Sequence, residues 1–193
     1  MKLCLATHNE HKAKEMRALL PSLFEVITLK SLDYYDDIPE TGQTFRENAF
    51  IKANHIYQKY KINAIADDSG LEVEALQGAP GVYSARYAGE PANDERNITK
   101  LLLDLRYATD RKANFISVIC LILNGEAHYF EGKIFGTITN EKVGTNGFGY
   151  DPIFVPEGYN ITFAEMDASI KNTISHRAIA MNKFKDYMYS IYK

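Results

Sequence analysis

Two long runs of strand-forming residues, 114–123 and 126–137, are joined by the dipeptide Asn124-Gly125. This dipeptide between two such runs is the strongest short-range signal for a β-hairpin, because Asn and Gly tolerate the positive φ angles of a two-residue turn. The second half of the chain is therefore predicted to contain an antiparallel strand pair. Any fold assigned to the chain has to include that pair.

The first half of the chain alternates short apolar runs with amphipathic segments. Runs typical of buried strands occur at 3–6, 26–29 and 64–67. Asn9 is predicted to cap a helix that Pro21 ends, and Thr44-Phe-Arg-Glu47 matches the capping box of a second helix. Alternating strands and helices followed by a hairpin predict an α/β fold with a mixed central sheet flanked by helices.

The other elements follow from local patterns. Residues 71–75 alternate apolar and acidic side chains and predict a half-exposed strand, whereas the Gly- and Pro-rich segment 77–91 predicts an ordered loop. Asn93 is predicted to cap a third helix, residues 140–151 form a glycine-rich loop, and a last helix begins at Ser175.

Composition limits the class of protein. With 193 residues, 46% of them hydrophobic, the chain is predicted to build one core and a single domain over residues 1–193. A net charge of −3 argues against a general duplex-DNA binder. Cys4 and Cys120 lie in apolar runs and are predicted to be buried free thiols. The longest apolar run, 116–123, is far shorter than the ~20 residues of a membrane span, so we expect a cytoplasmic protein without a membrane partner.

Two adjacent carboxylates, Asp67 and Asp68, follow the apolar run and precede Ser69 and Gly70. Gly70 is expected to end the strand, which would put the carboxylates at its carboxyl end, where open α/β sheets bind ligands. Adjacent carboxylates are costly unless a cation or basic groups neutralise them, and oxygen ligands of this kind suit Mg²⁺. The alternative is an Asx-type turn with Gly70 at positive φ.

A second polar cluster lies where the first strand meets the first helix. Thr7 and Asn9 occupy the turn and Lys12 the first helical turn, where free backbone N–H groups and the helix dipole favour a phosphate. The alternative is an ordinary capped helix with a solvated lysine.

Three further groups have both a functional and a structural interpretation. Glu40 lies in an acidic loop, Phe148 and Tyr150 lie in the glycine-rich loop and offer flat faces for a base, and His176 and Arg177 supply hydrogen-bond donors at a helix start. Taken alone, each is more simply explained as a solvated loop, core aromatics or a helix cap.

Six stretches in order along the chain resemble the inosine/xanthosine triphosphate pyrophosphatase family, the enzymes that remove non-canonical purine nucleotides. They extend from Leu5 to Ala180 and are LATHNEHK, ETGQTFRENAFIKA, AIADDSGLEVEAL, GAPGVYSARYAG, GFGYDPIF and SHRAIA. One stretch alone would be a weak signal, but six in the right order are specific.

The resemblance implies a two-lobed α/β fold with a substrate groove between the lobes, and a homodimer. It also implies Mg²⁺-dependent hydrolysis of ITP, dITP or XTP to the monophosphate and pyrophosphate. The partner is then a small-molecule nucleoside triphosphate, not a nucleic acid.

The same resemblance assigns roles to residues. Asp68 matches the general base and Lys12 the second catalytic residue, while Glu40, Asp67 and Asp68 match the metal-binding positions. The triphosphate is assigned to the turn formed by Thr7, His8, Asn9, Glu10, His11 and Lys12. Further substrate contacts are assigned to Ser69, Phe148, Gly149, Tyr150, Asp151, Lys171, His176 and Arg177. His8 departs from the family pattern, which often has glycine or another small residue at this position.

Base selection follows from hydrogen-bond chemistry. Donors such as His176 and Arg177 would pair with the 6-oxo group of hypoxanthine or xanthine and face the 6-amino group of adenine donor to donor. Three alternatives remain at this point: a Maf-like pyrophosphatase acting on pyrimidine or modified nucleotides, a non-catalytic nucleotide-binding protein, and a structural or RNA-associated module.

Overall fold

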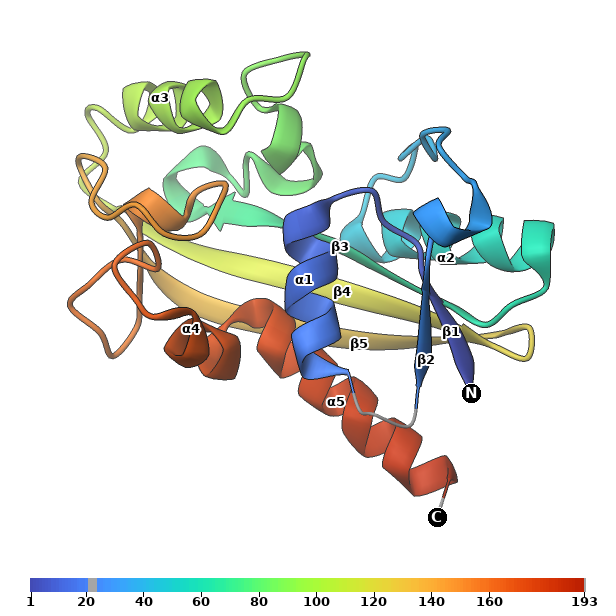
Figure 1. Cartoon of the computed structure of the whole chain (residues 1–193). Helices are drawn as coiled ribbons and strands as arrows, with labels where there is room; N and C mark the ends of the chain where they lie inside the picture. The colour runs from blue at the N-terminus through green and yellow to red at the C-terminus, as the bar shows by residue number, and fades with distance from the viewer. Residues whose placement is uncertain (21–23, 193) are drawn as a thin grey trace. The chain divides into compact units, whose positions relative to one another are not determined.

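The computed structural model describes residues 1–20 and 24–192 and contains a six-stranded sheet in the order β2-β1-β3-β4-β5-β6 (Figure 1). Strand β1 pairs in parallel with β2 and β3, whereas β5 and β6 are antiparallel. The strands are β1 (Lys2–Leu5), β2 (Glu25–Thr28), β3 (Ala64–Val73), β4 (Lys112–Leu123), β5 (Glu126–Ile138) and β6 (Phe154–Pro156). The predicted α/β fold with a mixed sheet is confirmed.

The helices begin where their capping residues predict. Asn9 accepts a hydrogen bond from the Lys12 backbone N–H, and Thr44 and Glu47 form the complete capping box. The helices are α1 (Glu10–Leu19), α2 (Phe45–Tyr60), α3 (Asp94–Asp104), α4 (Ala168–Ile174) and α5 (His176–Ile191). Pro21, predicted to end the first helix, lies outside the described residues, and α4 was not predicted.

The predicted hairpin is present between β4 and β5. Asn124 has a φ of 51° and Gly125 a φ of 94°, so both turn residues adopt the left-handed backbone conformation. The sequence signal was strong here because few residues other than Asn and Gly adopt this conformation without strain.

Contacts divide the chain into two compact units. The first comprises Met1–Asp68, Ser117–Gly132 and Arg177–Lys193, and the second comprises Ser69–Ile116 and Lys133–His176. The single domain over 1–193 and the groove between two lobes stay predictions.

The core of the first unit lies mainly between the sheet and two helices. Met16 of α1 and Phe184 of α5 pack with Leu3, Leu5 and Ile65 on one face of the sheet. Helix α2 covers the opposite face (Figure 1). Cys4 and Cys120 are buried free thiols, as predicted.

The second unit has its own core. Ile98 and Leu101 of α3 join strand residues Leu71 and Val73 and an aromatic group that includes Phe154. Loop 77–91, predicted without helix, contains a six-residue 3-10 helix, Gly81–Arg86.

The expected end of the third strand at Asp67 is wrong. Strand β3 extends from Ala64 to Val73, so both aspartates lie inside it. The first residues of the segment predicted as a separate strand, 71–73, are the end of β3. Gly70 is not among the residues with positive φ, which also excludes the Asx-type turn. The strand tolerates the two carboxylates because each contacts a basic side chain, Asp67 with Lys12 and Arg177 and Asp68 with Lys52.

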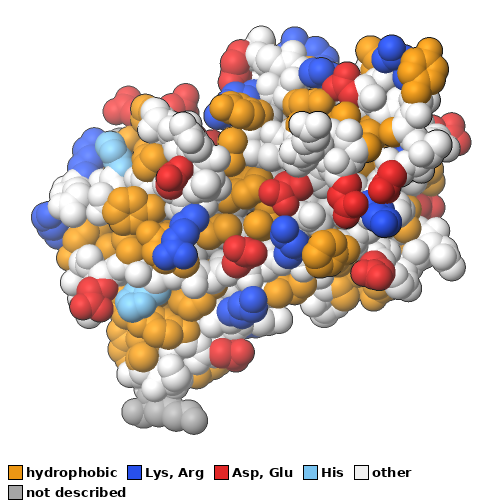
Figure 2. Space-filling model, turned by 180° about the vertical axis from the view of Figure 1, so that it is seen from behind, with side chains coloured by type: hydrophobic (Ala, Val, Ile, Leu, Met, Phe, Trp, Pro, Cys, Tyr) orange, Lys and Arg blue, Asp and Glu red, His pale blue; other side chains and the backbone are white. Residues whose placement is uncertain are grey.

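The surface carries charges of both signs. The chain has 22 Lys and Arg against 25 Asp and Glu, and on the face in Figure 2 these side chains are interspersed among apolar ones. Within the described part of the chain, no helix combines the length and the apolar character needed to cross a membrane.

Candidate active site

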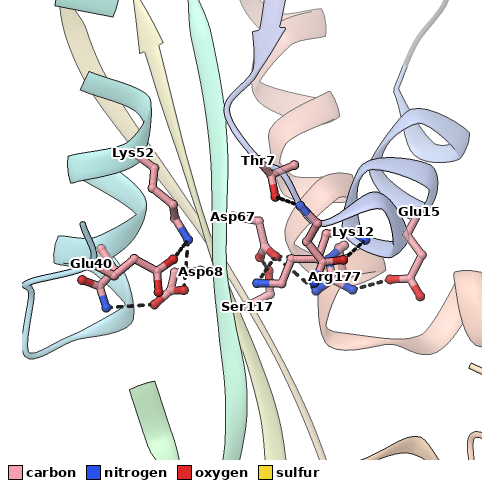
Figure 3. A network of polar contacts seen from close by, with 11 residues as sticks. Thr7, Lys12, Glu15, Glu40, Lys52, Asp67, Asp68, Ser117 and Arg177 are labelled. Carbon is pink, nitrogen blue, oxygen red and sulfur yellow. Dashed lines mark hydrogen bonds and ion pairs between the residues drawn. The ribbon is translucent and has the colours of Figure 1, made fainter. Parts of the chain in front are cut away.

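Asp67 and Asp68 point to opposite faces of β3, as neighbouring residues in a strand do. Figure 3 shows Asp67 directed toward α1 and α5 and Asp68 directed toward α2. Both side chains are buried, with residue exposures of 1% and 5%. The adjacent carboxylates therefore belong to two separate clusters instead of facing each other.

The Asp67 cluster contains Asp67, Lys12, Arg177, Glu15 and Ser117. The Asp67 Oδ2 lies 3.2 Å from the Lys12 Nζ and 3.1 Å from a terminal nitrogen of Arg177. Ser117 donates its hydroxyl to the other oxygen of Asp67, and Glu15 pairs with the second terminal nitrogen of Arg177. Two cations and two carboxylates leave this cluster with no net charge.

This environment changes the acidity of Asp67. Burial alone would raise its pKa, but the charges of Lys12 and Arg177 and the Ser117 hydrogen bond outweigh burial and hold the pKa far below its usual range. Asp67 is therefore a permanent carboxylate. Its negative charge keeps Lys12 within the cluster, with a side chain only 15% exposed.

The Asp68 cluster contains Asp68, Glu40, Lys52 and Asn48. The Lys52 Nζ lies 3.1 Å from the Asp68 Oδ1 and 2.5 Å from the Glu40 Oε1 (Figure 3). The ammonium of Lys52 is thus shared by two carboxylates.

Asp68 is shifted in the opposite direction from Asp67. Burial raises the pKa of Asp68 above its usual value, although Lys52 and Lys12 act against this. A carboxylate with a raised pKa inside a polar cluster has the properties of a general base.

The Asp68 cluster also suits a divalent cation. Among the described residues, no group of three or more His, Cys, Asp or Glu side chains is placed to hold a metal ion. Mg²⁺ commonly uses one or two carboxylates and completes its shell with water and substrate phosphates. Asp68 and Glu40 supply two carboxylates that share the ammonium of Lys52, whereas the Asp67 carboxylate contacts two cations, Lys12 and Arg177.

The turn 7–12 forms as predicted. The Thr7 Oγ1 accepts a hydrogen bond from the Asn9 N–H at 3.1 Å, and the Asn9 Oδ1 accepts from the Lys12 N–H at 3.0 Å. Glu10 and His11, the other members of the turn, are exposed. The turn thus combines an exposed helix start with Lys12 directed into the Asp67 cluster.

His8 has contacts of its own. Its Nε2 lies 3.0 Å from the carbonyl oxygen of Asp36, and its ring stacks on Tyr34 with the centroids 6.0 Å apart. Because a carbonyl only accepts, Nε2 carries the proton. His8 therefore joins the turn to the acidic loop that leads to Glu40.

In the second unit, another buried ion pair organises the glycine-rich loop. The Lys171 Nζ lies 2.7 Å from the Asp151 Oδ2, and the same oxygen accepts from the Phe148 N–H at 2.8 Å. The Lys171 ammonium is 4.9 Å from the centre of the Phe148 ring. Gly147 is required here, because a Cβ atom would lie 2.0 Å from that oxygen of Asp151.

The remaining predicted substrate residues of the second unit have different surroundings. Tyr150 packs into the core and donates its hydroxyl to the Ser84 carbonyl at 2.9 Å. His176 is 5% exposed and stacks on Phe115, while Ser69 is half-buried. Gly149 donates its N–H to Asp94 at 2.7 Å, which connects the loop to the start of α3.

The structure thus brings together Lys12, Asp67 and Arg177, and separately Glu40 and Asp68. Sequence reasoning missed two members of these clusters, Glu15 and Ser117, and left Lys52, near helical spacing from Asn48, as either a solvated lysine or the wall of a pocket. Lys52 follows Asn48 by four positions on α2, and a lysine and an asparagine on the buried side of a helix are a usable signal. Ser117 is a polar residue within the apolar part of β4, which is a weaker signal.

The model of the Ham1 family matches residues 3–187. The chain belongs to the Ham1 family. The dITP/XTP pyrophosphatase of Christiangramia forsetii is 50% identical, with 97% of this chain and 99% of that protein covered. The corresponding enzyme of Porphyromonas gingivalis is also 50% identical, covering 97% of each chain. The family resemblance seen in the six sequence stretches is thereby confirmed.

Solved Ham1 structures have the same fold. The Ham1 protein of Staphylococcus aureus superposes with a TM-score of 0.91 at 41% identity, covering 98% of this chain and 99% of that chain. The HAM1 protein of Coxiella burnetii gives a TM-score of 0.92 at the same identity and coverage. The Ham1 fold therefore extends over nearly the whole chain.

Proposed function

We propose that this Ham1 protein hydrolyses non-canonical purine nucleoside triphosphates, dITP, ITP and XTP, to the monophosphate and pyrophosphate. The observation that carries the proposal is the pair of clusters on opposite faces of β3. One holds Lys12 against Asp67, and in the other Asp68 and Glu40 lie together around the ammonium of Lys52. The dITP/XTP pyrophosphatase relatives at 50% identity support the substrate class.

The turn 7–12 is the proposed triphosphate site. The N–H groups at the start of α1 and its dipole favour an anion, and Lys12 adds a positive charge next to it. Lys12 then stabilises the negative charge that develops on the phosphate in the transition state. Asp67 acts through Lys12, since the two are in contact at 3.2 Å.

Asp68 is the proposed general base. It removes a proton from the attacking water while the water oxygen bonds to the α-phosphorus. The bond from that phosphorus to the α–β bridging oxygen breaks, and pyrophosphate leaves with the bridging oxygen. Lys52 holds one oxygen of Asp68 at 3.1 Å and so limits rotation of the carboxylate.

Asp68 and Glu40 are the residues that would hold Mg²⁺. When bound there, Mg²⁺ supplies positive charge to the phosphate oxygens and the departing pyrophosphate. These two carboxylates and the phosphates together satisfy the preference of Mg²⁺ for hard oxygen ligands.

Base recognition is assigned to the second unit. Phe148 offers a partly exposed ring, and Lys171 and His176 supply donors for a 6-oxo group. Adenine presents an amino group at that position, and a donor left unsatisfied by it costs about 1–3 kcal/mol.

We also expect a homodimer in the cytoplasm, where the nucleotide pool is found.

The deciding experiment measures pyrophosphate release from dITP, ITP, XTP, dTTP, ATP and GTP, with and without Mg²⁺. Mg²⁺-dependent release from the first three at rates well above the others supports the proposal. Preference for dTTP would favour a Maf-like activity instead. Binding of dITP without turnover would make the protein a nucleotide-binding module, and salt-sensitive RNA binding without turnover would favour the RNA-associated alternative.

A further inference from the structure

Asn48 is a buried polar residue at the start of α2, with no exposed surface. Its Oδ1 accepts a hydrogen bond from the backbone N–H of Gly42 at 2.8 Å, and its Nδ2 donates to the Asp68 Oδ2 at 3.3 Å. A buried amide has to satisfy both ends, and this one does so with a loop on one side and the proposed base on the other.

The orientation of this amide is determined by the backbone. The N–H of Gly42 can only donate, so it has to face the oxygen of Asn48. The rotated amide would set its NH₂ against that N–H and its oxygen against the Asp68 carboxylate. Gly42 therefore ensures that Asn48 presents a donor to Asp68.

We propose that Asn48 is a positioning residue that fixes the carboxylate of Asp68 for its role as base; the inference rests on the function proposed above. Lys52 holds the Oδ1 of Asp68 at 3.1 Å and Asn48 holds the Oδ2 at 3.3 Å. Donors on both oxygens restrict rotation about the bond that carries the carboxylate. Asn48 and Lys52 are four positions apart, so one helix face supplies both donors.

The same two residues fix the loop that carries Glu40. Lys52 pairs with Glu40, and Asn48 binds Gly42, two positions further along the chain. These contacts form a closed ring. Asp68 contacts Asn48, Asn48 binds the loop, and Lys52 contacts both the loop and Asp68. The spacing between the carboxylates of Asp68 and Glu40 is therefore set from α2.

Gly42 gives a second way to test this ring. A Cβ atom at this position would lie 2.6 Å from the Glu47 Cβ and 2.8 Å from the Asn48 Oδ1. Gly42→Ala must therefore displace the loop or the amide. If Asn48 positions Asp68, this displacement reaches the base even though Gly42 does not contact it.

The informative substitution is Asn48→Asp. It preserves the shape and the acceptor for the Gly42 N–H, but it replaces the donor facing Asp68 with an oxygen. Asn97 is the matched control, since it is also a buried helix asparagine, 2% exposed, whose amide accepts from the Ala88 N–H and donates to the Ala85 carbonyl. Asn97→Asp makes the same chemical change within the second unit.

The experiment compares kcat and KM for dITP at saturating Mg²⁺, with melting temperatures measured alongside. Wild-type turnover of dITP tests the proposed function, and the variants then test Asn48. A misplaced catalytic group costs up to about 100-fold, so we expect kcat to fall about 10–100-fold in Asn48→Asp and Gly42→Ala. KM should stay within about threefold of wild type, and Asn97→Asp should retain kcat even if it melts lower.

Two results would overturn the inference while leaving the proposed function standing. One is a wild-type kcat in Asn48→Asp. The other is a loss of kcat in Asn97→Asp as large as in Asn48→Asp at an equal drop in melting temperature, since that is a purely structural effect. If Asn48→Asp does not fold, Gly42→Ala decides: an unchanged kcat refutes the inference and a reduced kcat with unchanged KM supports it.

Discussion

A terminal nitrogen of Arg177 lies 3.1 Å from the Asp67 Oδ2, although 110 residues separate them in the sequence. Both side chains are buried, at 1% exposure each, and Lys12 contacts the same oxygen of Asp67. The Asp67 carboxylate therefore joins the start of α5 to the start of α1. Its charge is therefore expected to stabilise the fold as well as to hold Lys12 in place.

Asp67→Asn is expected to destabilise the protein by about 3–5 kcal/mol at neutral pH, because Lys12 and Arg177 both lose the carboxylate that they share and only Glu15 remains as a counter-charge, on Arg177. The pKa of Asp67 is lowered in the folded protein from an ordinary value of 3.8. Its contribution is thus fully present above about pH 4 and is lost only as the pH falls toward the folded-state pKa. Urea unfolding at several pH values should show a constant gap between wild type and variant from pH 5 to 8 that narrows in strong acid.

Asp186→Asn is the control for that series, since Asp186 is an exposed aspartate on α5. This substitution should leave the free energy of unfolding nearly unchanged at every pH of the series. A gap for Asp67→Asn that closes already between pH 5 and 7 would show that the carboxylate is not held in its charged form.

Arg177→Ala is expected to lower kcat/KM for dITP and for ATP by the same factor. The sequence suggested that Arg177 contacts the 6-oxo group, which predicts a loss specific to dITP. In the structure its guanidinium is bound to Asp67 and Glu15, so its removal acts through Lys12 on a triphosphate that both substrates share. The measurement is the ratio of the two kcat/KM values in wild type and variant.

His176→Ala provides the contrast. If His176 donates to the 6-oxo group, the advantage of dITP over ATP should shrink by about 1–3 kcal/mol, which is about 5- to 150-fold in the ratio of the two kcat/KM values. A shrinking ratio in Arg177→Ala, with an unchanged ratio in His176→Ala, would reverse the two assignments.

Local signals in the sequence were sufficient for the elements with a special cap or turn. Asn9, Thr44 and Asn93 mark helix starts, and Asn124-Gly125 marks the hairpin, because each feature depends on a few neighbouring residues. Strand β3 was misjudged for the opposite reason. Whether Gly70 ends a strand depends on the neighbouring strands, and these come from distant parts of the chain.

The candidate residues were predictable as residue types, but their arrangement was not. Asp67 and Asp68 looked like one pair, and only the uninterrupted strand shows that they face opposite sides. Glu15 and Ser117 acquire their significance from Arg177 and Asp67, which are brought to them by the fold. The spacing of polar and apolar residues along the sequence does not reveal contacts between such distant segments.

His8→Gly introduces the small residue that the family often has at this position. It removes the stack on Tyr34 and the hydrogen bond to the Asp36 carbonyl, which joins the turn to the acidic loop. A hydrogen bond of this kind contributes about 1 kcal/mol, so we expect KM for dITP to rise about fivefold with little change in kcat. His8→Gln retains a donor and should restore part of the affinity; equal KM values in all three proteins would show that the contact has no influence on substrate binding.

Asp68→Asn tests the proposed base directly. The substitution keeps the size of the side chain and its contacts near Lys52 but removes the proton acceptor, so kcat should fall by about 10²–10⁴. Glu40→Gln is the comparison, because Glu40 shares Lys52 with Asp68 but is assigned to the cation alone. Raising Mg²⁺ should recover much of the activity of Glu40→Gln and little of that of Asp68→Asn. Recovery of both variants to the same extent would reduce Asp68 to a metal ligand, and near-normal turnover by folded Asp68→Asn would place the base elsewhere.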